Sequence, residues 1–124
     1  MLGGVAAADG GVLDVEITLE AGPGVLYDAL VIPGGEAAVA AWARDANALD
    51  FVRLQYRHCK PLLLVGEAVS LLTKAGVPDA LPDGSPDLAL ITAEPETLTD
   101  ALSAFKAALA GHRSFAREAD LPMV

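Results

Sequence analysis

The spacing of apolar and polar residues near the start of the chain predicts a β-hairpin over residues 3–19. From Val12 to Leu19, apolar residues at every second position alternate with polar ones, a period of two that is typical of a strand with one wet face. Asp9-Gly10-Gly11 before it supplies the positive-φ positions of a tight turn, and residues 3–8 form a weaker, Gly/Ala-rich partner strand.

Three uninterrupted aliphatic runs follow the hairpin, over residues 27–32, 61–65 and 88–92. Runs of this kind are typical of strands that are buried on both faces of a parallel sheet. The first ends in Pro33-Gly34-Gly35 and the second in Gly66, residues at which a strand stops.

Helical patterns lie between and after these runs, over residues 36–44, from Asp45 to about residue 60, over 67–75 and over 95–111. Asp45 is a candidate N-cap, and Gly76 is a candidate C-terminal stop. In the last helix, a capping box is expected at Thr97 and Asp100, and one apolar stripe contains Leu98, Leu102, Phe105 and Leu109. Because strands alternate with helices, the pattern predicts an α/β domain with a mostly parallel sheet. Residues 114–124 show no period.

Composition and charge narrow the possible functions. The 124 residues carry 8 Lys+Arg against 17 Asp+Glu, for a net charge of −9, and 53% of them are apolar. This indicates a single folded domain over residues 1–124 and argues against binding to nucleic acid or to an anionic membrane surface. The lone Cys59 excludes an intramolecular disulfide, and His58, Cys59 and His112 do not have metal-ligand spacing. A cytoplasmic location is the default expectation.

The strand and turn at residues 61–69 occupy the place where an α/β enzyme would hold a nucleophile. The elbow position is Gly66, which has no side chain. Glu67 follows it, and a carboxylate at a helix start ordinarily serves the helix dipole, although it is the one candidate for an unconventional catalytic group. Cys59 lies seven residues upstream, roughly 20 Å away at the other end of the strand, and is expected to be a structural thiol.

Gly34 and Gly35 are weak candidates for a backbone cradle that binds an oxyanion or phosphate, but a tight strand-to-helix turn explains them better. His58 and His112 are expected at a surface or interface. Trp42 is expected to be a packing or interface anchor, and Asp9, Asp83 and Asp87 are expected to belong to turns.

The segment from Tyr27 to Gly35, Tyr-Asp-Ala-Leu-Val-Ile-Pro-Gly-Gly, resembles the strand-and-turn signature of the class I glutamine amidotransferase-like superfamily. A narrower resemblance covers nearly the whole chain. It combines residues 8–10 and 27–35 with Lys60 to Ala68, an acidic loop, a long helix and residues 110–113, and it is similar to the C-terminal domain of large-subunit haem catalases of the hydroperoxidase II type.

This resemblance implies a flavodoxin-like three-layer fold without the catalytic Cys of the superfamily, because the elbow is Gly66. It therefore implies no catalytic residue, no metal ligand and no cofactor in this chain. Haem would be bound by an upstream β-barrel domain, with a Tyr axial ligand, that is absent here. The implied role is a non-catalytic accessory domain of a hydrogen peroxide-dismutating catalase, with a stabilising, assembly or chaperone-like function.

The implied partners are further copies of the chain or the rest of a catalase tetramer. The chain opens on a hairpin rather than on a central strand and its helix, so we expect the first β-α unit of the fold to be missing and the domain to be truncated at its N-terminus. Two alternatives stay open. One is an amidotransferase-like hydrolase or glyoxalase that uses Glu67, and the other is a small-ligand binding module at the carboxyl edge of the sheet.

Overall fold

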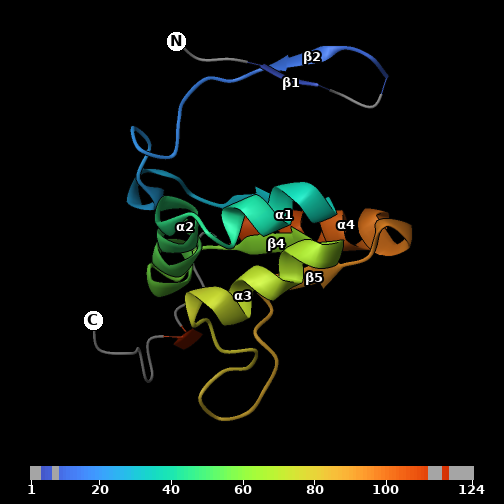
Figure 1. The fold of residues 1–124 in the computed structure, drawn as a ribbon. Coiled ribbons are helices and arrows are strands. Elements are labelled where there is room, and N and C mark those ends of the chain that lie inside the picture. Colours follow the sequence, from blue (N-terminus) through green and yellow to red (C-terminus); the bar gives the residue numbers. More distant parts are fainter. Residues whose placement is uncertain (1–3, 7–8, 112–115, 118–124) are drawn as a thin grey trace.

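The central element of the fold is a three-stranded parallel sheet with the order β3-β4-β5 (Figure 1). The computed structural model describes residues 4–6, 9–111 and 116–117. The strands are β3 (Leu30–Ile32), β4 (Leu62–Val65) and β5 (Leu90–Ala93), with Leu30 opposite Leu62 and Leu62 opposite Leu90. The predicted α/β architecture with a parallel sheet is confirmed, and each of the three aliphatic runs contributes one strand.

The predicted hairpin is also present, with β1 (Gly4–Ala6) antiparallel to β2 (Val12–Asp14). Figure 1 shows it standing apart from the sheet, at the end of a long connection. The strand prediction through Leu19 was too long, since β2 ends at Asp14 and the chain turns at Thr18, whose carbonyl accepts from the amide of Gly22 at 2.9 Å. The alternation of apolar and polar residues was not enough to form a strand there, because no described strand pairs with residues 15–19.

One face of the sheet is covered by helices α1 (Glu36–Trp42), α2 (Ala46–Arg57) and α3 (Ser70–Ala75), the last preceded by the 3-10 turn η2 (Gly66–Val69). The Asp45 carboxylate accepts hydrogen bonds from the amides of Asn47 and Ala48, as its N-cap prediction requires. Gly76 ends α3 in the left-handed conformation, at φ 76°. The main core lies on this side and includes Ile32, Val52, Leu62, Leu64 and Leu71.

The other face is covered by α4 (Leu98–Ala110), which follows the 3-10 turn η3 (Pro95–Thr97). Phe105 and Ala101 are buried against Leu63 and Val65. The predicted stripe on this helix is only partly correct, since Leu102 and Leu109 are each 38% exposed. The capping interaction also lies one turn earlier than predicted.

The amide of Glu94 donates to Oγ1 of Thr97 at 3.1 Å. Thr97 is therefore the last residue of a capping box that starts at Glu94, whereas the prediction made it the first residue of a box that ends at Asp100. The helix consequently begins after a 3-10 turn rather than at the predicted box.

The prediction that all three aliphatic runs form strands buried on both faces is not correct for the outer strands. All four residues of β4 are buried, but Val31 in β3 is 46% exposed. The reason is the helix layout, because α4 packs on β4 and β5, and no other described helix lies on the same face of β3.

Candidate functional site

The two glycine-containing turns at the carboxyl ends of β3 and β4 meet and form the candidate site. Their contact is a hydrogen bond from the amide of Gly35 to Oε2 of Glu67, at 3.1 Å. The structure therefore brings together Gly34, Gly35, Gly66 and Glu67, the four residues of the two turns that were singled out from the sequence. Strands 32 residues apart in the chain end side by side because β3 and β4 are parallel neighbours.

Gly34 is where the two turns approach most closely. A Cβ atom at this position would lie 3.1 Å from the backbone oxygen of Val65 and 3.0 Å from Oε2 of Glu67. The first neighbour is backbone and cannot swing away. Gly34 is thus explained by the packing of one turn against the other.

Gly66 has the backbone of a sharp elbow, with φ 57° in the left-handed region. A Cβ atom here would meet no heavy atom within 4 Å, so the space beside it is open. Room for a side chain exists at the position where a nucleophile would project, but glycine contributes none. The elbow therefore has the shape of a catalytic turn without the reactive atom.

Glu67 is exposed, and its carboxylate is held by backbone amides. Hydrogen bonds from its own amide and from that of Gly35 lower the pKa of Glu67 below its usual 4.5. A general acid or base works best when its pKa lies near the working pH, and this shift moves the pKa of Glu67 in the opposite direction. The contacts instead describe a carboxylate that joins two turns. The same contacts occupy the amide of Gly35, which a bound anion would need.

Cys59 lies at the opposite end of β4 from the elbow, as expected. It is 1% exposed and has a positive φ of 62°, which is unusual for a residue other than glycine. Its Sγ lies 3.9 Å from the carbonyl oxygen of Arg57, a weak contact at the end of α2. His58 is exposed, and His112 falls outside the described residues.

Within the described ranges, no group of three or more His, Cys, Asp or Glu side chains is placed to hold a metal ion. In the same ranges, no helix is long and apolar enough to cross a bilayer.

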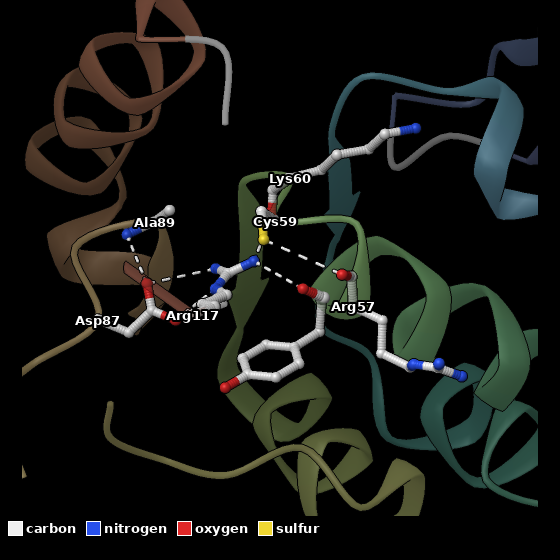
Figure 2. Close-up of polar contacts among 7 residues, drawn as sticks. Arg57, Cys59, Lys60, Asp87, Ala89 and Arg117 are labelled. Atoms are coloured by element: carbon white, nitrogen blue, oxygen red, sulfur yellow. Dashed lines mark hydrogen bonds and ion pairs between the residues drawn. The ribbon is translucent and has the colours of Figure 1, made fainter. Parts of the chain in front are cut away.

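A buried ion pair near Cys59 was missed by the sequence reasoning (Figure 2). Asp87, expected in a turn, is buried and accepts from Nε of Arg117 at 2.5 Å and from Nη2 at 3.3 Å. Its Oδ1 also accepts from the amide of Ala89 at 3.0 Å, so the local turn prediction was right and the burial was not foreseen. Arg117 lies in a segment without hydrophobic period, and no sequence signal marks its partner 30 residues away.

Arg117 also connects the carboxyl-terminal segment to the start of β4. Its Nη1 donates to the carbonyl oxygens of Lys60 at 2.7 Å and Tyr56 at 3.3 Å. Its guanidinium carbon lies 4.6 Å from the centroid of the Tyr56 ring, a cation–π contact. Burial raises the pKa of Tyr56 above 10.0, and the nearby Arg117 charge opposes this rise. The three guanidinium nitrogens of Arg117 all have acceptors and the cluster is buried, which is typical of a structural element.

The chain is similar in sequence to known proteins over most of its length. The family model of the C-terminal domain found in long catalases matches residues 4–119. This chain belongs to that family. The predicted resemblance to large-subunit catalases is thereby confirmed.

Three relatives illustrate the relationship. Catalase HPII of Mycobacterium avium is 35% identical over 95% of this chain, and catalase HPII of Pseudomonas aeruginosa is 33% identical over 93%. Catalase C of Rhizobium meliloti is 39% identical over 70% of this chain. The chain spans only 18%, 15% and 12% of the length of these three proteins, respectively.

Proposed function

We propose that this catalase C-terminal domain is a non-catalytic accessory domain that stabilises or helps to assemble a haem catalase. The observation that carries the proposal is Gly66, an elbow with open space beside it and no side chain to react. The family supports the parent activity, because the relatives named above are catalases.

The alternative activity, a hydrolase or glyoxalase that depends on Glu67, has weaker support. The lowered pKa of Glu67 and the hydrogen bond that its carboxylate accepts from the amide of Gly35 favour an ionised carboxylate with a structural role. A ligand-binding module at the same edge would have to compete with that carboxylate for the amide of Gly35. For these reasons we assign no catalytic, cofactor-binding or metal-binding residue to the chain.

Haem chemistry is assigned to another part of the catalase polypeptide. The two tyrosines of this chain are engaged elsewhere, Tyr56 beneath Arg117 and Tyr27 against the ring of Phe51, whose centroid lies 5.6 Å away. The partners of this chain would be the other domains of a catalase oligomer or further copies of the chain. The net charge of −9 disfavours nucleic acid and membranes as partners, and a cytoplasmic location fits this role.

The first experiment tests for catalysis in the purified chain. Haemin is titrated while the Soret band is followed, and oxygen release from hydrogen peroxide is measured in parallel. We expect no stoichiometric haem complex and no turnover above haemin alone. Saturable haem binding with turnover would overturn the assignment. Hydrolase and glyoxalase substrates are assayed with the native chain and with Glu67→Gln, and an activity lost in this variant would establish the alternative.

The second experiment tests the accessory role in a complete enzyme. The matching C-terminal region of Mycobacterium avium catalase HPII is replaced by residues 1–124, and a second version lacks the region altogether. We expect the chimera to keep its oligomeric state and to survive heating several-fold longer than the truncated enzyme. Equal half-lives and equal assembly in the two versions would refute a stabilising role. Suppression of heat-induced aggregation of the truncated enzyme by the separate domain would identify the chaperone-like form of that role.

A further inference from the structure

The guanidinium of Arg117 fills a socket whose walls come from three segments of the chain (Figure 2). Its Nε and Nη2 donate to the two carboxylate oxygens of Asp87, at 2.5 and 3.3 Å. Its Nη1 donates to the carbonyl oxygens of Lys60 at 2.7 Å and of Tyr56 at 3.3 Å. The Tyr56 ring forms the floor, with its centroid 4.6 Å from the guanidinium carbon. A carboxylate, two carbonyls and an aromatic face together match the charge, the donors and the flat shape of a guanidinium.

The carboxylate wall of the socket is held by contacts that do not involve Arg117. Oδ1 of Asp87 accepts from the amide of Ala89 at 3.0 Å, and the carbonyl of Ala89 accepts from the amide of Leu62 at 2.8 Å. The amide of Leu90 also donates to the carbonyl of Asp87, at 3.1 Å. These bonds fasten the loop that contains Asp87 to the first residues of β4 and β5. We therefore expect the carboxylate to keep its position when the arginine side chain leaves.

The two carbonyls of the socket are fixed by the end of α2. Tyr56 is 4% exposed and belongs to the main core, and its carbonyl also accepts from the amide of Cys59 at 3.0 Å. The amide of Lys60 donates to the carbonyl of Gln55 at 3.0 Å. The socket is thus organised by its own segments, and such preorganisation lowers the cost of binding a ligand.

The apolar cores, in turn, do not depend on Arg117. Neither core contains a described residue that comes after Phe105 in the chain. Ala116, the described neighbour of Arg117, is exposed. Withdrawal of the Arg117 side chain would break hydrogen bonds, an ion pair and a ring contact, but it would leave the two cores packed. Parts of a protein that share few apolar contacts with the rest open at a lower free energy than the whole domain unfolds.

We propose that Asp87, Tyr56 and the carbonyl of Lys60 form a preformed guanidinium-binding site, here called the guanidinium socket, and that Arg117 is its detachable latch. The latch opens to water while the sheet stays folded. The socket selects a guanidinium over an ammonium, because an ammonium has one nitrogen and cannot reach the carboxylate and both carbonyls from the same place.

The first test measures the opening of the latch in the full native chain. Hydrogen exchange of the Arg117 Nε–H group and of the Leu64 amide, at the centre of the sheet, is followed by NMR at increasing urea concentration. We expect the protection factor of the Arg117 group to be at least tenfold lower than that of Leu64. Its exchange rate should hardly change with urea, because local opening exposes little surface, whereas the rate at Leu64 should rise with the slope of global unfolding. Equal protection with equal slopes would overturn the detachable latch.

The second test asks whether the socket binds a guanidinium that is not attached to the chain. The full chain with Arg117→Ala is titrated with millimolar ethylguanidinium and, separately, with ethylammonium. We expect ethylguanidinium to shift the NMR signal of the Ala89 amide saturably, because this amide donates to Asp87, and to raise the thermal midpoint. Ethylammonium should do neither, and Arg117→Lys should melt no higher than Arg117→Ala. If Arg117→Ala is unfolded, folding that returns with ethylguanidinium alone supports the socket equally.

An exposed arginine provides the matched control. Arg53 is 43% exposed and pairs with Asp50 on α2, so Arg53→Ala should gain nothing from ethylguanidinium. Equal responses of Arg117→Ala to the two cations, or equal responses of the two variants to ethylguanidinium, would refute a selective socket. Protection of the Arg117 Nε–H group that falls on dilution of the native chain would show that Arg117 fills the socket of a second copy, and this would overturn a latch within one chain.

Discussion

The pair formed by Arg117 and Asp87 makes the strongest prediction about stability. Both side chains are buried, at 0% and 2% exposure, and the guanidinium donates to the carboxylate through two nitrogens. In Arg117→Ala, the carboxylate of Asp87 would keep only the amide of Ala89 as a described donor, and the carbonyl of Lys60 would lose its 2.7 Å bond. Removing one member of a buried pair leaves an uncompensated charge, which costs about 3–5 kcal/mol.

That loss is large compared with the free energy of unfolding of a typical domain, about 5–15 kcal/mol. With a urea m-value of about 2 kcal/mol per molar, the midpoint should fall by roughly 1.5–2.5 M. Urea denaturation followed by circular dichroism measures the shift. The double variant Arg117→Met with Asp87→Asn should be more stable than the sum of the two single variants predicts. Each single variant leaves one buried charge without its partner, whereas the double variant leaves none.

The exposed pair of Arg53 and Asp50 provides the control. Their side chains are 43% and 60% exposed, and they contact each other within α2. Asp50→Asn should cost less than about 1 kcal/mol, as surface pairs do. If Arg117→Ala lowered stability by no more than this control, or if the two changes at the buried pair were additive, the reasoning from burial would be refuted.

Three further predictions concern the turns, a tyrosine and a helix cap. Gly66→Ala should cost about 1 kcal/mol from its positive φ alone, since its Cβ meets open space. Gly34→Ala should cost more, about 1–3 kcal/mol, because the new Cβ presses on the carbonyl of Val65; equal losses in urea melts would contradict this order. Burial raises the pKa of Tyr56, so its contribution to stability should be present below pH 10 and lost as pH rises through the folded-state pKa. NMR titration of its ring should give a midpoint above 10.0, and a lower midpoint would refute the shift. Asp45→Ala should cost about 1 kcal/mol by removing the cap of α2, and an unchanged thermal midpoint would show that the cap contributes nothing.

Local signals predicted most of the secondary structure. The three aliphatic runs, the Asp45 cap and the Gly76 stop all act over a few residues, and each is found where it was expected. The four candidate residues of the turns were also identified from the sequence, as residues at the ends of two predicted strands. That the two strands are neighbours, so that the turns meet, came from the structure. What the sequence could not show was that the Glu67 carboxylate would occupy the amide of Gly35.

The errors concern features that depend on distant parts of the chain. Alternation continued to Leu19, but a strand exists only where a partner pairs with it. Leu102 and Leu109 fit an apolar stripe, yet it is Ala101 and Phe105 of helix α4 that are buried against the sheet. Asp87 satisfied a local turn rule and also received Arg117 from 30 residues away.

The sequence by itself determined the strands, the helices, the glycine elbow without a nucleophile and membership of the catalase C-terminal family. These properties follow from residue type and short-range spacing, which act on the backbone directly. Only the tertiary structure decided that Arg117 and Asp87 form a buried pair and that Val31, in a predicted buried strand, is 46% exposed. Burial and pairing depend on which elements pack together, and no pattern within a single segment contains that information.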